Sequence, residues 1–272
     1  MNISHSSENF SFQRISSPKC DVEIHIHDTY EIYQALSGNI KYFIEGNCYK
    51  LNIGDIIITN TKEVHRPTTI NESVYERRFI QFQPEIFEFF FDNFNPLAIF
   101  DSRPKGTHNC FQVNNNSTIN QLFNRIELCS DDAVGKLEIK ALLIQLFIEL
   151  YKQYDDKKIL EGQIIDPRIL RVKEDLDNHF THDFTLDQFS KKHYMDKYYL
   201  SHLFKEVTGF TILEYIHSKR IQFAKQLIKE NKQMTEVAHL CGFNDYSNFY
   251  RVFKKITNYS PKDYKNTNKS DA

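Results

Sequence analysis

The 272-residue sequence predicts an α+β multidomain protein, with a β-barrel and flanking helices first and an all-helical domain second. Three observations lead to this prediction. Alternating runs rich in Ile, Tyr, Val and Phe fill the chain up to Gln83, helical periodicity dominates after Pro167, and a polar stretch separates the two. We therefore expect domains at 1–156 and 167–272, joined by a linker at 157–166.

The N-terminal half contains short runs that favour β-strands. In the last of them Tyr75, Arg77 and Phe79 alternate with Arg78 and Ile80, so the two sets should face opposite sides of a sheet. Closely spaced hairpin strands of this length favour a barrel or jelly roll that hides its edges. The predicted strands are CDVEIHIH, YEIYQAL, NIKYFIEG, NCYKL, GDIIITN and SVYERRFIQFQ.

Three helices are predicted after the barrel. Pro84 begins one with Ile86, Phe87, Phe90 and Phe94 on its buried side, and Ser117 is a candidate cap for the next. The third, at 134–154, is apolar on two sides and needs two partners. One partner is the barrel. The second side is either a homodimer face or is also buried within the monomer.

The C-terminal half repeats one pattern, at 185–209 and 235–264: a short helix, a tight turn and a second helix with an apolar stripe. Asp196 is the expected N-cap of the second helix in the first repeat. Asn244 or Asp245 is the expected N-cap of the second helix in the second repeat. A helix over 211–230 joins the repeats. Its length of about 30 Å is close to one turn of DNA, roughly 34 Å, which suits two helix-turn-helix units on successive major grooves.

Charge is divided unevenly along the chain. The formal net charge is −2, but residues 167–272 carry 18 Lys and Arg against 13 Asp and Glu, whereas the rest carries −7. A basic domain with two helix-turn-helix units fits nucleic-acid binding at one end of the protein. The five cysteines show no metal-ligand spacing, so we expect buried, reduced thiols, with redox sensing as the alternative.

At these repeats the chain resembles the AraC/XylS family of bacterial transcription regulators. The departures from the family pattern are Ser190, Asn258 and Lys265, none of which threatens the fold. The resemblance implies a bipartite DNA-binding domain attached to a regulatory domain. The matching residues are Arg220, Ala224, Val237-Ala238, Cys241-Gly242-Phe243, Phe253-Lys254-Lys255, Ser260-Pro261 and Tyr264.

The family pattern also implies which residues bind DNA. We expect Arg251 to read a guanine, and Lys205 and Lys254 to contact phosphates. Arg220 either orients the two units through a carboxylate such as Glu236 or binds phosphate. The full set of expected DNA-binding residues is Tyr198, Ser201, His202, Lys205, Arg220, Tyr246, Ser247, Tyr250, Arg251 and Lys254.

The spacing His25-x-His27-x3-Glu31, followed by Gly54-Asp55 and His65, resembles the two motifs of the cupin barrel. In metal-binding cupins the corresponding residues hold one ion. We expect these three His and Glu31 to form an effector-binding polar clamp instead, without a cofactor, because regulatory domains of the family keep the pattern without metal. A metal site and a proton-sensitive cluster are the alternatives.

The prediction is a cytoplasmic DNA-binding transcription regulator, not an enzyme, with a cupin-like sensing and dimerisation domain. Its expected partners are double-stranded DNA, a small effector, a second copy of the chain and, as a further candidate, RNA polymerase. The sequence has no run of 18 or more apolar residues, and its first 30 residues lack a signal-peptide core, so we expect no membrane association. Two alternatives stay open: a metal-dependent cupin oxygenase or isomerase tethered to DNA, and an effector-independent dimeric regulator. An activator and a repressor fit equally.

Overall fold

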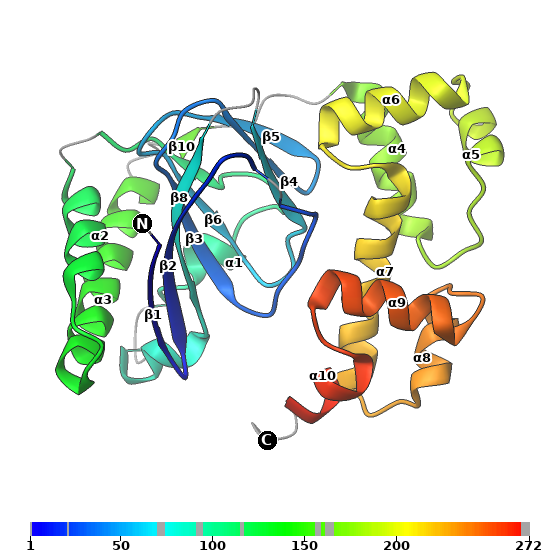
Figure 1. Cartoon of the computed structure of the whole chain (residues 1–272). Helices are drawn as coiled ribbons and strands as arrows, with labels where there is room; N and C mark the ends of the chain where they lie inside the picture. Colours follow the sequence, from blue (N-terminus) through cyan, green and yellow to red (C-terminus); the bar gives the residue numbers. More distant parts are fainter. Residues whose placement is uncertain are drawn as a thin grey trace. The chain divides into compact units, whose positions relative to one another are not determined.

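The computed structural model of the chain describes residues 2–20, 22–69, 74–90, 95–114, 117–155, 159–160 and 166–267 (Figure 1). They form two compact units. The first comprises residues 1–22, 28–63 and 67–163, and the second comprises 164–272 with the short segments 23–27 and 64–66. No described helix is both long and apolar enough to cross a membrane. The predicted linker at 157–166 lies mostly outside the described residues.

The strands form two sheets. The larger has the order β1-β2-β8-β3-β6-β9-β10 and the smaller the order β5-β4-β7. Neighbours in the larger sheet pair antiparallel, with Tyr33 opposite both Ile57 and Phe79. The strands are β1 (Ile3–Ser7), β2 (Phe10–Ser17), β3 (Tyr30–Ala35), β4 (Ile40–Ile44), β5 (Asn47–Leu51), β6 (Ile56–Thr59), β7 (His65–Thr69), β8 (Tyr75–Phe82), β9 (Cys110–Phe111) and β10 (Ile159–Leu160).

Side-chain alternation divides the first unit into two apolar cores. Tyr75 and Phe79 of β8 pack with β4 and β5 in an inner core between the sheets. Ile80 and Phe82 of the same strand face an outer core, formed with the helices of this unit. The predicted alternation along β8 is confirmed. A side chain on the Tyr75 face therefore points into the interior of the domain.

The helices of the first unit cover the outer face of the larger sheet. The bounds are η1 (Pro84–Phe90), α1 (Ala98–Asp101), α2 (Thr118–Leu128) and α3 (Ala133–Asp155). Ser117 caps α2 as predicted, because its hydroxyl accepts from the N–H of Asn120 at 3.2 Å. The helix predicted at Pro84 is a 3₁₀-helix with Ile86 and Phe87 buried; Phe94 lies outside the described residues.

Helix α3 buries one of its two apolar sides. The helix lies beside α2 (Figure 1). Leu142, Leu146 and Leu150 pack in the outer core. On the other side Leu137 is 68% exposed and Ile148 is 45% exposed. The alternative in which both sides are buried within the chain is thus not what the structure of this unit shows.

A buried ion pair holds the loop before β9. The side chains of Arg103 and Glu63 are fully inaccessible, with Nη1 to Oε1 and Nη2 to Oε2 distances of 2.7 Å. Glu63 also accepts from the N–H of Gly106 at 2.7 Å and from Asn109 Nδ2 at 3.1 Å. Because every charged atom has a partner, the pair tolerates burial that would otherwise cost several kcal/mol.

The second unit is helical after Asp166. The fold class predicted from the sequence is confirmed: a sheet-rich N-terminal domain with flanking helices and an all-helical C-terminal domain. Helix α7 begins with a reciprocal capping box between Thr211 and Glu214. The helices are α4 (Pro167–His179), α5 (Leu186–Lys192), α6 (Lys197–Thr208), α7 (Ile212–Lys229), α8 (Met234–Leu240), α9 (Tyr246–Thr257) and α10 (Pro261–Thr267).

One predicted strand is wrong and several strands are new. The described residues of 20–27 form no strand, and an isolated bridge pairs His25 with His65. This bridge consists of the two hydrogen bonds that His25 exchanges with His65, at 3.3 and 3.2 Å, which is too short a ladder for a strand. The alternation within 20–27 holds nevertheless: Ile24 and Ile26 are buried, and His25 is only partly buried.

Candidate DNA interface and effector site

The first helix-turn-helix unit consists of α5 and α6. Asp196 caps α6 by accepting from the N–H groups of Tyr198 at 2.9 Å and Tyr199 at 3.1 Å. Tyr194 makes the turn between the helices with a φ of 54°. Leu200 and Phe204 of α6 are fully buried. The opposite face of α6 is therefore the one presented to solvent.

That face of α6 carries the residues predicted to bind DNA. Tyr198 is 75% exposed, and His202 and Lys205 are also exposed. Ser201 is partly buried. Nδ1 of His202 lies 3.7 Å from a carboxylate oxygen of Glu206, which is a weak contact between two exposed side chains.

The second unit consists of α8 and α9 and has the same form. Asp245, one of the two predicted caps, accepts from the N–H of Asn248 at 2.7 Å. Asn258 ends α9 with a φ of 63°, the left-handed conformation expected for it. The predicted apolar stripe of α9 is confirmed by the burial of Phe249, Val252, Phe253 and Ile256.

The outer face of α9 is polar and aromatic. Its five predicted DNA-binding residues are all exposed. Nη2 of Arg251 donates to Oδ1 of Asn248 at 3.1 Å, and the guanidinium makes no ion pair with any described residue. Its charge is thus free for another partner. The exposed residues are Tyr246, Ser247, Tyr250, Arg251 and Lys254.

Arg220 differs from the other predicted DNA-binding residues because it is only 8% exposed. Its Nε donates to the carbonyl of Phe180 at 2.6 Å, and its Nη2 donates to the carbonyl of His182 at 2.8 Å. The guanidinium also lies over the ring of Phe243, 5.4 Å from its centroid. Burial lowers the pKa of Arg220. Its described contacts are with backbone and an aromatic ring, not with Glu236.

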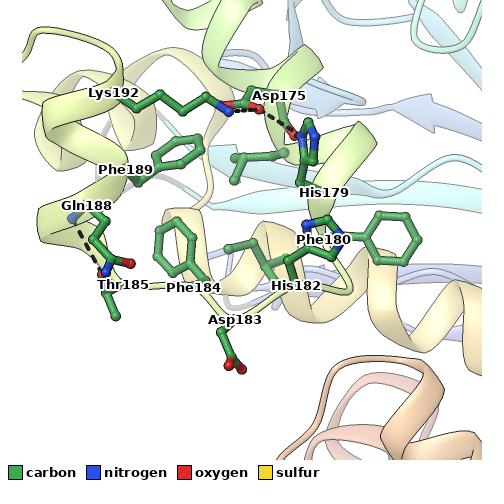
Figure 2. Close-up of a pocket in the computed structure, with 12 residues that line it drawn as sticks. Asp175, His179, Phe180, His182, Asp183, Phe184, Thr185, Gln188, Phe189 and Lys192 are labelled. Carbon is green, nitrogen blue, oxygen red and sulfur yellow. Dashed lines mark hydrogen bonds and ion pairs between the residues drawn. The ribbon is translucent and has the colours of Figure 1, made fainter.

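Asp175 connects α4 to the first helix-turn-helix unit (Figure 2). Its carboxylate lies 2.6 Å from Nζ of Lys192, 2.9 Å from Nε2 of His193 and 2.8 Å from Nδ1 of His179. Burial raises the pKa of Asp175, but Lys192 and His193 outweigh this and lower it overall. Below this cluster lies a pocket of about 210 Å³ with Phe180, Phe184 and Phe189 among its lining residues.

A basic hollow of about 570 Å³ lies beside the turn between α5 and α6. Arg168, Arg171, Lys192 and His193 line it. Arg168 pairs with Asp166, with its Nη2 2.5 Å from the carboxylate, whereas Arg171 makes no ion pair with any described residue. Sequence reasoning missed Arg171 because nothing in the spacing of α4 distinguishes it from an ordinary exposed arginine.

The structure brings together the four residues predicted to bind the effector. One nitrogen of each of His25, His27 and His65 and one carboxylate oxygen of Glu31 all lie within 4.8 Å of one another. The ring centroids of His25 and His65 are 4.3 Å apart, and those of His27 and His65 are 5.0 Å apart. Glu31 and His65 are buried, while His25 and His27 are partly exposed. His25 and His27 therefore keep some exposure to solvent.

Neighbouring side chains orient Glu31. Its Oε1 accepts from the hydroxyl of Tyr42 at 3.1 Å, and its Oε2 accepts from Nε2 of Gln81 at 3.0 Å. The ring of Tyr42 packs edge-on against Tyr33, with centroids 4.8 Å apart. Three imidazoles and an oriented carboxylate can bind a polar ligand, and by composition and distance they also suit a metal such as Zn²⁺.

Duplicated helix-turn-helix units joined by one helix, with a separate sheet-rich domain that holds a polar cluster, define a two-domain transcription regulator. Family models agree with this class. An AraC-like ligand binding domain matches residues 12–147, and a helix-turn-helix domain matches residues 189–267. The chain belongs to the AraC family of transcription regulators.

The chain is similar to several known proteins. An uncharacterized HTH-type transcriptional regulator of Staphylococcus aureus is 26% identical over 235 residues, 85% of this chain and 30% of that protein. The chain thus spans about a third of that relative's length. YijO, an uncharacterized HTH-type regulator of Escherichia coli K12, is 34% identical over 95 residues, 35% of this chain and 34% of that protein. Unsaturated fatty acid bound ToxT of Vibrio cholerae is 14% identical, covers 96% of each chain and has a TM-score of 0.45.

Proposed function

We propose that this protein is a sequence-specific regulator that acts in the cytoplasm and binds operator DNA through α6 and α9 under the control of a small effector. The observation that carries the proposal is the division of α9 into a buried apolar stripe and an exposed polar face. A helix of this kind after a tight turn is how helix-turn-helix proteins present side chains to base edges in the major groove.

The exposed residues divide into two roles. Arg251 has a fork of N–H donors and no carboxylate partner among the described residues, so we assign it to a guanine edge. Lys205 and Lys254 lie towards the ends of their helices and are assigned to phosphates, with Arg171 as a further candidate. Arg220 is assigned a positioning role, because its donors are used by backbone carbonyls.

The effector is proposed to bind at His25, His27, His65 and Glu31. An imidazole can donate or accept, and Glu31 is held in place by two donors, so the cluster suits a ligand with hydroxyl or amine groups. The partial exposure of His25 and His27 gives a ligand access to it. Binding there would change how the sensing domain or α3 acts on the DNA-binding domain.

Helix α3 is the proposed homodimer surface. Apolar residues recur along this helix with spacings of 3, 4, 3 and 4, which is the pattern of a coiled-coil seam; Ile144 is partly buried against the outer core and the other four are exposed. Leu137→Glu together with Ile148→Glu should convert a dimer into a monomer in analytical ultracentrifugation, whereas Lys140→Glu on the same helix should not. The residues of this seam are Val134, Leu137, Ala141, Ile144 and Ile148.

The proposal is tested by selecting a binding site from random DNA, screening ligands by thermal shift on the full chain, and measuring operator affinity with and without the best ligand. Replacing His27 and Glu31 by Ala should abolish the ligand response and leave ligand-free DNA binding intact. Glu8→Ala, on the exposed β1–β2 turn, is the matched control. A double variant with an unchanged response would place the sensor elsewhere.

A metal-dependent enzyme is the second candidate, because the His25, His27, Glu31 and His65 atoms lie at distances that suit one ion. Elemental analysis of the purified protein distinguishes the two functions. Stoichiometric metal, lost together with ligand binding on treatment with a chelator, would favour the metal site. A metal-free protein that still responds to its effector would favour the polar clamp.

A further inference from the structure

An arginine lies on the inner face of β8, and no described carboxylate forms an ion pair with it. The alternation of the strand puts Arg77 on the same side as Tyr75 and Phe79, which pack in the inner core. Its guanidinium carbon is 5.0 Å from the ring centroid of Tyr75 and 5.2 Å from that of Phe79. Within the described part of the chain Arg77 forms no ion pair. By contrast Arg78, its outward neighbour, pairs with Glu127 at 2.7 Å.

Hydrogen bonds around Arg77 leave a surplus of donors. Its Nη1 donates to the hydroxyl of Tyr75 at 2.7 Å, and that hydroxyl also pairs with the hydroxyl of Tyr33 at 3.3 Å. Only one of the two hydroxyl protons can lie between the two oxygens. The proton of the other hydroxyl therefore has no acceptor among the described residues. The buried Nε of Arg77 has no hydrogen-bond partner there either.

The two tyrosines remain donors at neutral pH. Burial raises the pKa of the Tyr33 hydroxyl well above its ordinary value, and burial likewise raises the pKa of Tyr75. Both rings are almost inaccessible to solvent. A guanidinium and neutral phenols together supply N–H and O–H groups but no negative charge, and buried donors are normally satisfied.

We propose that the effector carries a carboxylate, which Arg77 binds through Nε and which a hydroxyl of the Tyr33–Tyr75 pair also contacts. This rests on the proposed function, in which the N-terminal domain binds a small effector. A carboxylate fits better than a phosphate, because one guanidinium balances one negative charge and its planar fork matches two carboxylate oxygens. A dianion would be left with uncompensated charge among buried tyrosines.

The interior thus has two ends of opposite chemistry. Arg77 and Tyr75 offer donors, whereas Glu31 offers carboxylate oxygens that already accept from Tyr42 and Gln81. Glu31 and Arg77 lie on adjacent strands, β3 and β8, where Glu31 faces Gln81 and Arg77 faces Ala35. An acid with a hydroxyl or amine at its far end satisfies both ends, and a purely neutral ligand leaves the Arg77 end unsatisfied.

The experiment compares acids with their uncharged amides on the full-length protein. The probes are acetate and acetamide, hexanoate and hexanamide, phenylacetate and phenylacetamide, and 3-hydroxybutyrate and its amide, by thermal shift and calorimetry at constant ionic strength. At least one acid should stabilise the protein while its amide does not. Arg77→Gln should weaken that acid by about 10- to 100-fold, as expected for a lost hydrogen bond to a charged group.

Two further variants separate a binding role from a structural one. Tyr75→Phe keeps the ring and should weaken the acid about 10-fold. Arg125→Gln, on the exposed face of α2, is the matched control and should leave binding unchanged. If Arg77→Gln fails to fold, Arg77→Lys replaces it and should keep the preference for acid over amide at reduced affinity.

The inference is overturned if no acid binds, if an amide binds as tightly as its acid, or if Arg77→Gln binds the acid as wild type does. Its failure is distinct from that of the proposed function. A neutral ligand that needs His27 and Glu31 but not Arg77 would leave the effector site standing and remove only the carboxylate. An acid that binds through Arg77 but never changes operator affinity would support the carboxylate site and contradict effector control of DNA binding.

Discussion

Substituting Arg220 tests whether it positions the two helix-turn-helix units or contacts DNA. Two charge-assisted hydrogen bonds, to the carbonyls of Phe180 and His182, and a ring contact with Phe243 are at stake. Each such hydrogen bond contributes about 1.5 to 3 kcal/mol and the ring contact about 0.5 to 2 kcal/mol. Because the three share one side chain and do not add fully, Arg220→Ala should destabilise the C-terminal domain by about 3 to 5 kcal/mol.

Arg220→Lys is the more informative change. Lysine keeps the charge but reaches one carbonyl at most, so a loss of about 1 to 3 kcal/mol is expected. For a domain of this size that lowers the midpoint of thermal unfolding by about 5 to 20 °C. The assay is thermal unfolding of the full chain, with operator affinity measured well below the midpoint. Lys229→Arg, an exposed change in α7 itself, is the control.

The result that would refute the positioning role is specific. If Arg220→Lys unfolds at the wild-type temperature but binds operator more weakly, then Arg220 contacts DNA rather than backbone carbonyls. If affinity at low temperature stays near wild type while stability falls, the positioning role stands.

Three further predictions concern the same domain. Arg251→Ala should weaken operator binding by about 1 to 3 kcal/mol with little effect on random duplex, and equal losses of affinity on both DNAs would contradict base reading. Lys254→Ala should weaken binding to both DNAs and reduce the slope of log affinity against log salt by about 0.9. Gly242→Ala should destabilise the domain, because a Cβ there would lie 2.2 Å from the carbonyl oxygen of Thr181 at a φ of 83°; unchanged urea unfolding would argue against this close approach. Burial, followed by nearby arginine and lysine charges, lowers the pKa of His217 from 6.5 to about 4. The unfolded chain then binds the extra proton between these values, so stability is fully present above pH 6.5 and falls as the pH drops towards 4. His217→Phe should remove this loss of stability, on the order of 1 kcal/mol after allowance for solvent screening. A variant whose stability falls with pH as steeply as that of the wild type would exclude His217 as the cause.

The elements that sequence predicted best are those with strong local signals. In α9 the cap at Asp245, the stripe from Phe249 to Ile256 and the left-handed end at Asn258 act within a few residues of one another, and all three are found. The alternation along β8 was predicted for the same reason. Such features follow from periodicity and from caps, which need no knowledge of the rest of the fold.

The parts that sequence missed depend on tertiary pairing. β1 and β2 are rich in Ser; β1 pairs with β2, and the partners of β2 on β8 lie between 58 residues (Ser17 and Tyr75) and 72 residues (Phe10 and Phe82) further along the chain. An orienting role for Arg220 was one of the two alternatives, but its acceptors were missed because they are backbone carbonyls, which every residue carries. The surplus of donors at Arg77 likewise appears only when Tyr33 is placed beside Tyr75. The His and Glu cluster was predicted because its residues belong to recognisable motifs.

The unbroken helix α7 has a consequence for the operator. It has 18 residues and a capped N-terminus, so we expect it to act as a rigid connection between the two helix-turn-helix units. Inserting one residue would rotate everything after it by about 100° and advance it by about 1.5 Å. Since DNA turns once in about 10.5 base pairs, that rotation corresponds to roughly three base pairs of phase. In the proposed complex, where each unit reads its own half-site, the half-sites can differ in sequence but the number of base pairs between them stays constant.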